Sequence, residues 1–348
     1  MASSSRSHGQ GRKPYRWSEK EASSSAVKRR PGKELAETRN WLEDLPRDVT
    51  IAMLQKVGTI DILENIQKVC VSWRKICKDP TLWRSIDMRN TGDFQDMPYD
   101  LVEMTKHAID RSCGQLLDIN LEYFGNNDLL KYITDSTNQL RRLRIVLCWA
   151  ISDEGISEAA KKLPYMEELH IYFGNITNVG LENVGRSCPS LKSLTYNQQG
   201  VVLPLMDSDE DEVDLNVDAL AISRTMPQLH HLSLFGNQMT NEGLEAILDA
   251  CPHLESLDLR QCFGINLSGP LGKRCSSSIK ALRLPDDSTS DYEFDATVYK
   301  GCGYNSYDDD YLPGFSDTDL VTDDDEDYAS LGYDSFDDNE NVSDVDFL

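Results

Sequence analysis

The chain has 348 residues, a formal net charge of −24 at pH 7 and only 39% hydrophobic residues. Its mean hydropathy of −0.48 is low for one compact globule, so we expect a folded part flanked by polar tails. No apolar run approaches the roughly 20 residues that a membrane-spanning helix needs, which excludes a transmembrane protein.

The charge is concentrated towards the two ends of the chain. Residues 286–348 contain 21 Asp and Glu against a single Lys, whereas residues 1–40 contain 10 Lys and Arg against 4 Glu. Because both segments lack apolar periodicity, we expect a disordered basic arm and a disordered acidic tail. The basic run Lys28–Lys33 is interpreted as a solvated tether, with nuclear import as the alternative. The tail is interpreted as a solubiliser, a docking strip for a basic partner, or a lid over Arg142 and Arg144.

The cysteines and the first residues indicate the compartment. Nine cysteines are scattered without a CxxC pair, and most occupy apolar periodic positions, where cysteine behaves as a small hydrophobe. The stretch MASSSRSHGQGRK contains no apolar segment typical of a secretory signal. We therefore expect a reduced, intracellular protein in the nucleus, the cytoplasm or both.

Residues 41–92 show apolar positions at helical spacing. Val49, Met53 and Val57 recur every four residues and predict a first helix. A second stripe follows and ends at Pro80, because the residue before a proline disfavours the helical conformation. This second stripe comprises Ile62, Ile66, Val69, Trp73 and Ile76. So small a helical module has a marginal core, which favours support by a partner or a neighbouring domain.

The module resembles the F-box family through four sequence elements. They are Leu45-Pro46, Val69-Cys70 with Trp73, Asp79-Pro80 and Leu82-Trp83, which occur in the family's order and at its spacing. In that family the module docks on the Skp-type adaptor of a cullin–RING ubiquitin ligase. The resemblance implies an adaptor-binding surface formed by Leu45, Pro46, Val49, Ile51, Leu54, Ile62, Leu63, Val69, Cys70 and Trp73. The sequence departs from the family at Gly58 and at Thr50, where the usual residue is leucine, and Thr50 implies slightly weaker adaptor packing.

A repeated LxxLxL pattern fills most of residues 93–285. It occurs at 140–148, 166–174, 191–199, 229–237 and 254–262, with partial copies at 116–121 and 279–284. Its central Ile or Leu recurs at intervals of 24, 26, 25, 38, 25 and 25 residues. Matching glycines and prolines recur in the helical connections 151–164, 176–189 and 239–252. This pattern predicts a leucine-rich-repeat solenoid, and it resembles the cysteine-containing subtype found in F-box proteins.

The predicted fold class is an α/β repeat that follows a small helical F-box. Each repeat supplies one short strand and one helix, and the repeats must stack because a single unit cannot bury its apolar face. Parallel strands are expected on the inside and helices on the outside. The one long interval contains the acidic run MDSDEDEVD, so residues near 200–216 are expected to loop out as an insertion.

Alternation along the strands predicts which side chains line the concave face of the solenoid. Exposed aromatic residues between charges of both signs suit a protein partner better than a phosphate or a nucleic acid. The residues expected to contact a target protein are Arg142, Arg144, His170, Tyr172, His231, Phe235, Asp258 and Arg260.

The sequence shows no catalytic or metal-binding pattern. It lacks the HExxH, GxSxG, GxGxxG and Walker motifs, and the adjacent His230 and His231 would point to opposite faces of a strand. Cys188 occupies a repeat position that Leu163 or Cys251 fills in other copies, which indicates a core residue rather than a nucleophile. We expect no catalytic residue, no metal and no cofactor.

The combined patterns predict a substrate-recognition subunit of a Skp–cullin–F-box (SCF) ubiquitin ligase. Its expected partners are a Skp-type adaptor, the cullin and RING subunits reached through it, and a target protein on the concave face. No membrane and no direct nucleic-acid contact are expected. One alternative is a repeat scaffold whose F-box controls only its own turnover, and a further one is a small-ligand co-receptor.

Overall fold

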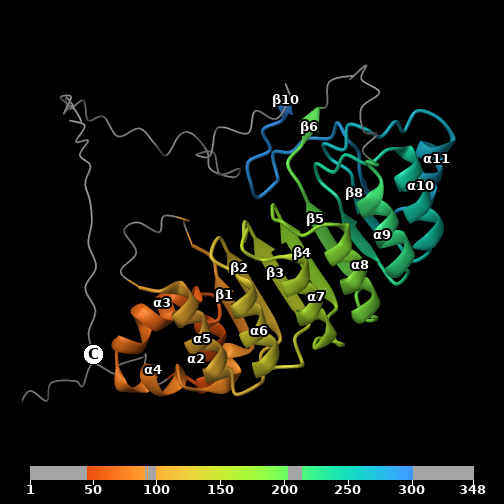
Figure 1. Cartoon of the computed structure of the whole chain (residues 1–348). Helices are drawn as coiled ribbons and strands as arrows, with labels where there is room; N and C mark the ends of the chain where they lie inside the picture. Colours follow the sequence, from red (N-terminus) through yellow and green to blue (C-terminus); the bar gives the residue numbers. More distant parts are fainter. Residues whose placement is uncertain (1–44, 91, 93–98, 203–213, 301–348) are drawn as a thin grey trace, which may run out of the picture. The chain divides into compact units, whose positions relative to one another are not determined.

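The computed structural model describes residues 45–90, 92, 99–202 and 214–300, and every element named below belongs to the unit Pro46–Leu348 (Figure 1). The basic arm 1–40 and the tail from residue 301 onwards lie outside the described residues, as does most of the acidic insertion.

Short helices form the first part of this unit. They are α2 (Arg47–Leu54), α3 (Thr59–Glu64), the 3-10 turn η1 (Ile66–Lys68), α4 (Val71–Ile76) and the 3-10 turn η2 (Pro80–Arg84). The second predicted stripe is thus divided among α3, η1 and α4. The Cys70 thiol caps α4 by accepting a hydrogen bond from the Trp73 amide, and the Asp79 carboxylate caps η2 by accepting one from the Thr81 amide. Local side chains therefore determine where these helices begin.

A parallel sheet follows the helices, and eight strands form it within the described residues. They are β1 (Ser85–Met88), β2 (Asp118–Glu122), β3 (Arg142–Val146), β4 (Glu168–Tyr172), β5 (Ser193–Asn197), β7 (His231–Ser233), β8 (Ser256–Asp258) and β9 (Ala281–Arg283). Neighbours in the sheet are neighbours in the chain, apart from the long connection between β5 and β7. The register aligns the predicted central residues, which run Ile119, Leu143, Leu169, Leu194, Leu232, Leu257 and Leu282. The repeat fold predicted from the sequence is confirmed.

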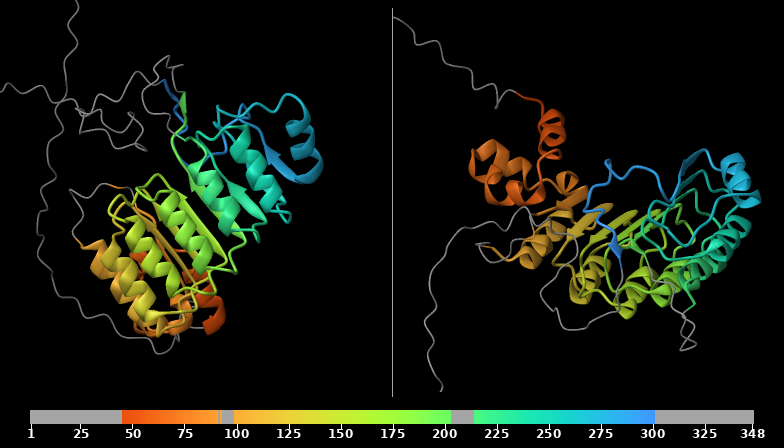
Figure 2. Two further views of the ribbon diagram at one scale, coloured as in Figure 1. Left: turned by 45° about the vertical axis from the view of Figure 1, so that its right-hand side comes forward. Right: turned by 90° about the horizontal axis from the view of Figure 1, so that it is seen from above.

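The helices of the repeats cover one face of this sheet (Figure 2). They are α5 (Leu101–Ser112), α6 (Asn127–Ser136), α7 (Asp153–Lys161), α8 (Asn178–Ser187), α9 (Val217–Thr225), α10 (Asn241–Ala250) and α11 (Pro270–Ser278). A separate pair of short parallel strands joins β6 (Val201–Val202) to β10 (Tyr299–Lys300). The other face of the main sheet carries no helix among the described residues.

The helical module and the repeats share one hydrophobic core, which runs from Leu54 to Ile279. Strand β1 belongs to the predicted F-box segment, yet it pairs with β2 and begins the sheet. The indole of Trp83 is 1% exposed, donates a hydrogen bond to the Cys77 carbonyl at 2.9 Å and lies under the Arg111 guanidinium of α5. The marginal core of the module is therefore completed by the first repeat.

The glycines that recur at the same position in successive repeats are explained by the contacts between repeats. The Asp153 carboxylate at the start of α7 accepts hydrogen bonds from the amides of Thr177, at 2.7 Å, and Gly180, at 3.1 Å, in the next repeat. Asn216 makes the same pair of contacts with Thr240 and Gly243. A Cβ atom at either glycine would lie within 3.0 Å of the accepting oxygen. Glycine is required because the neighbouring side chain fills the space.

Replacing Gly180 by Ala should therefore destabilise the protein by about 1–3 kcal/mol, although Ala favours a helix by about 1 kcal/mol over Gly. The added methyl displaces the Asp153 carboxylate and leaves two amide donors without their acceptor. Chemical denaturation of the full chain measures the change. The matched control is Gly174→Ala, because open space surrounds a Cβ there and the free energy of unfolding should change by less than about 0.5 kcal/mol. Equal stability of the two variants would contradict this account.

Candidate functional site

Two surfaces of the described structure are candidates for binding partners. The first is an apolar patch on the helical module. Pro46 immediately precedes α2, Val49 and Met53 lie in α2, Val69 lies just before α4, and Val71 is the first residue of α4. Val49, Met53, Val69 and Val71 are between 44% and 68% exposed, although each is large and apolar. Helices α2 and α4 contact each other, and Val69 directly precedes the residue that caps α4. We call these five residues the module patch, and such apolar exposure indicates a contact surface.

The structure separates the residues that the F-box resemblance implied as adaptor contacts. Leu54, Ile62 and Leu63 are at most 6% exposed and lie in the core, where they support the patch from below. Leu45, Ile51, Cys70 and Trp73 are half-buried, and Pro46, Val49 and Val69 are exposed. Thr50 is also buried, and its hydroxyl donates a hydrogen bond to the Pro46 carbonyl at 3.3 Å.

Met53 and Val71 belong to the module patch but were missing from the implied adaptor contacts. Met53 is four residues after Val49, so its helical spacing already placed it on the same side of α2. Val71 is the first residue of α4 and is 68% exposed, and no pattern in the sequence predicted its exposure.

The second surface is the helix-free face of the sheet, where charged side chains pair both within a strand and across neighbouring strands. Arg142 contacts Asp118 at 3.3 Å and Glu168 at 2.6 Å. Arg144 pairs with Glu122, and Arg260 pairs with Asp258 at 2.7 Å. Most charges on this face are therefore matched within the sheet, as cross-strand pairing favours.

His170 belongs to the same face and is largely enclosed. Its Nδ1 lies 2.9 Å from the Thr195 hydroxyl, and its Nε2 lies 3.5 Å from Glu168. Burial lowers the pKa of His170, so its imidazole is neutral near pH 7. His231 of β7, in contrast, is exposed.

Residues 286–300, which we call the strap, continue from β9 and lie on this face. The Tyr292 ring stacks on Phe235 with centroids 3.9 Å apart and planes 1° apart. The Phe294 ring lies 4.9 Å from Tyr172 and 5.8 Å from Phe173. Burial raises the pKa of Tyr292, whose hydroxyl accepts a hydrogen bond from the Asn197 amide at 3.3 Å.

Polar contacts fix the strap on both sides of its aromatic residues. Asp291 accepts hydrogen bonds from Arg260 at 2.7 Å and from Arg283 at 2.8 Å. Glu293 accepts one from Arg144 at 2.7 Å. Gln261 donates to the Ala296 carbonyl at 2.6 Å, and β10 at the end of the strap pairs with β6.

These contacts correct two predictions from the sequence. Residues 286–300 were expected to be part of a disordered tail, but two aromatic residues and two acids anchor them to the sheet. Phe235 was expected to be exposed, but it is 1% exposed because Tyr292 covers it, and Arg260 is 6% exposed for a similar reason. Local composition did not reveal the strap, because its anchoring partners are up to about 150 residues away in the chain.

The structure brings five of the eight predicted target-contact residues together around the strap. These are Arg144, Tyr172, Phe235, Asp258 and Arg260. Phe173 joins them, although strand alternation placed it on the helix side. Its φ of 51° is in the left-handed region, which interrupts the alternation at the end of β4 and turns its ring towards Phe294.

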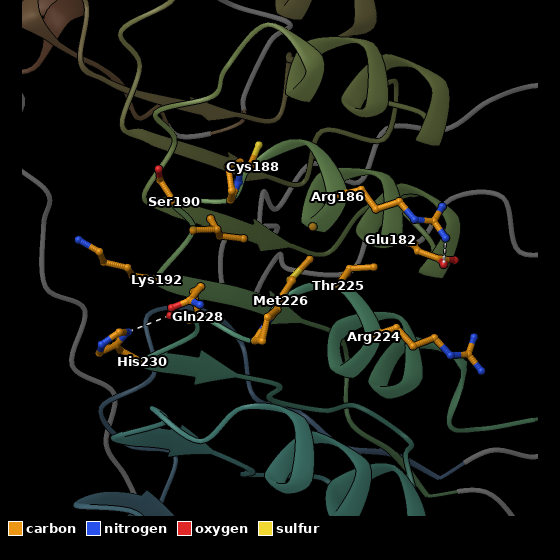
Figure 3. Close-up of a pocket in the computed structure, with 14 residues that line it drawn as sticks. Glu182, Arg186, Cys188, Ser190, Lys192, Arg224, Thr225, Met226, Gln228 and His230 are labelled. Atoms are coloured by element: carbon orange, nitrogen blue, oxygen red, sulfur yellow. Dashed lines mark hydrogen bonds and ion pairs between the residues drawn. The ribbon is translucent and has the colours of Figure 1, made fainter.

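A cavity of about 690 Å³ lies elsewhere, at the ends of α8 and α9 (Figure 3). Cys188, Lys192, Arg224 and His230 are among its lining residues. Burial raises the pKa of the Cys188 thiol to about 12, and its sulfur lies 3.6 Å from the Leu163 carbonyl. A thiol of such high pKa is a poor nucleophile, which agrees with a core role for Cys188.

The described part of the chain lacks a metal-binding cluster and a membrane-spanning helix. No group of three or more His, Cys, Asp or Glu side chains in residues 45–90, 92, 99–202 and 214–300 could hold a metal ion. Over the same ranges, no helix has the length and apolar character needed to cross a membrane.

Two family models match parts of this chain. The F-box-like family matches residues 42–89, and the Leucine Rich repeat family matches residues 226–248. Among solved structures, the complex of Rad7 and Elc1 from yeast is 17% identical and covers 70% of this chain and 63% of that chain, with a TM-score of 0.44.

Two curated relatives from Arabidopsis thaliana cover most of the described residues. F-box protein SKIP19 is 46% identical over 84% of this chain and 89% of its own length. F-box/LRR-repeat protein 21 is 45% identical over 75% of this chain and 86% of its own length. The resemblance seen in the sequence is confirmed, and the chain belongs to the F-box/leucine-rich-repeat protein family.

Proposed function

We propose that this protein is the substrate-recognition subunit of an SCF-type ubiquitin ligase. The observation that carries the proposal is the module patch, which exposes four large apolar side chains on a module of the F-box family. An adaptor of the Skp type would cover this patch, and the half-buried Ile51, Cys70 and Trp73 would complete the contact.

In this proposal the protein has no catalytic role of its own. It holds a target protein on the strand face of the repeats, near the ubiquitin-charged enzyme that the cullin and RING subunits recruit. Holding two reactants together raises their effective concentration, which is a sufficient contribution to catalysis for a receptor. The shared core of the module and the repeats supports this role, because a target on the sheet then has a fixed relation to the adaptor. Such a ligase operates in the nucleus or the cytoplasm.

The adaptor contact is tested by Val49→Glu combined with Met53→Glu. Both side chains are nearly half exposed, so the free energy of unfolding should change by less than about 1 kcal/mol. A carboxylate buried against an apolar partner surface carries a large desolvation cost, and we expect adaptor binding to weaken at least about 100-fold. Co-purification with the adaptor and titration calorimetry measure the effect.

The matched control for this test is Val179→Glu, because Val179 is 54% exposed on α8, within the repeats. It should bind the adaptor as the unchanged protein does. Full adaptor binding by the double variant would contradict the proposed contact surface.

The same double variant separates a receptor from a scaffold. It retains the strand face, so proximity labelling should capture the same proteins with the variant as with the unchanged chain. Only the unchanged chain should lower their abundance, and a proteasome inhibitor should restore it. If the captured proteins are equally abundant in cells that carry the variant and in cells that carry the unchanged chain, the result would instead favour a scaffold whose F-box controls only its own turnover.

A further inference from the structure

The strap meets the strand face through two copies of one arrangement. In the first, Arg260 lies over Phe235 and Tyr292, with its guanidinium 5.6 Å and 5.9 Å from the ring centroids, and it also binds Asp291. In the second, Arg144 lies over Tyr172 and Phe294, at 4.9 Å and 5.5 Å, and it also binds Glu293. Each site thus takes one acidic residue and the aromatic residue that follows it.

Each arginine divides its guanidinium between an acid of the sheet and an acid of the strap. Arg260 pairs with Asp258 as well as Asp291, and Arg144 pairs with Glu122 as well as Glu293. The guanidinium fork presents several donors in fixed directions, so it suits carboxylates held at a defined spacing. The acids of the sheet hold both arginines in place, which leaves donors aimed at the strap.

The face that the strap covers is far more enclosed than the strap itself. Phe235 and Arg260 are at most 6% exposed beneath it. The strap's own residues from 286 to 298 are all exposed or half-buried, and the side chains of Asp291 and Glu293 are about half exposed. Ion pairs at such exposure contribute little to stability. The rings of Tyr292 and Phe294 pack on a small apolar cluster around Phe173 that is separate from the main core, so the strap can leave without opening the main core.

We propose that the strand face is a docking site for acidic, aromatic peptide segments, and that Asp291–Phe294 occupies it as a tethered ligand. This inference rests on the proposed receptor function and specifies its target, which carries an acid, an aromatic residue, an acid and an aromatic residue in succession. Such a segment makes the contacts of the strap and displaces it. The strap therefore sets a threshold, because only a target that binds more strongly than a tethered competitor occupies the face.

The test uses the full chain and a labelled synthetic peptide with the sequence STSDYEFDAT, which is that of residues 288–297. The open variant combines Tyr292→Ala with Phe294→Ala and frees both sites. Fluorescence anisotropy should show the peptide binding the open variant at least about tenfold more tightly than it binds the unchanged protein. Binding should weaken as salt rises, because carboxylates and guanidinium groups form part of the contact.

Two controls define the chemistry of the site. A peptide in which both aromatic residues are replaced by Ala should bind neither protein. Adding Arg144→Ala and Arg260→Ala to the open variant should abolish binding of the original peptide. A second strap variant, Asp291→Asn with Glu293→Gln, keeps the aromatic rings and should bind the peptide with an intermediate affinity.

Absence of peptide binding to the open variant, or equal binding to both proteins, would overturn the proposal. Loss of cooperative unfolding in the open variant would also overturn it, because the strap would then be a structural part of the repeats. Neither the adaptor nor ubiquitin transfer enters this measurement. A negative result in this measurement would contradict the docking proposal alone. The proposed adaptor contact is tested separately, by the variant Val49→Glu with Met53→Glu.

Discussion

The structure depends on one constraint, which is that no single repeat can bury its own apolar face. The parallel register aligns the central Ile or Leu of every strand, so each repeat provides the surface that the next one covers. Side-chain contacts such as that of Asp153 with Thr177 and Gly180 fix the spacing between successive helices. Strand β1 extends the same ladder into the helical module, which therefore shares the core of the repeats.

The same ladder creates the chemistry of the strand face. Residues at one register position lie side by side, so Arg144 of β3 pairs with Glu122 of β2. Arg260 pairs with Asp258, two residues earlier in its own repeat. These pairs hold Arg144 and Arg260 in place against Tyr172 and Phe235. A surface that holds guanidinium groups over aromatic rings favours segments that contain both acidic and aromatic residues. The strap shows what such a segment is, because it presents acidic and aromatic residues in alternation.

The two candidate surfaces differ in kind, which suits two kinds of partner. The module patch is apolar and exposed, as expected of a surface that one dedicated partner covers. The strand face is charged, aromatic and already occupied by part of its own chain. In the proposed docking, a partner competes with the strap, so its affinity depends on the strap as well as on the contacts that the partner makes.

The sequence alone determined the repeat fold, because the spacing of Ile119, Leu143, Leu169 and their successors reports directly which side chains must stack. Its motifs also identified the helical module, and strand alternation predicted that Arg144, Tyr172, Phe235 and Arg260 share one face of the sheet. Only the tertiary structure decided that Leu54, Ile62 and Leu63 are buried, since helical spacing does not tell a core face from a partner face. One interpretation of the tail from the sequence, a lid over Arg142 and Arg144, anticipated the contact with Arg144 but not the aromatic anchors of the strap or the orientation of Phe173. Long-range contacts anchor the strap, and a left-handed residue at the end of β4 interrupts the alternation on which the sequence argument relied.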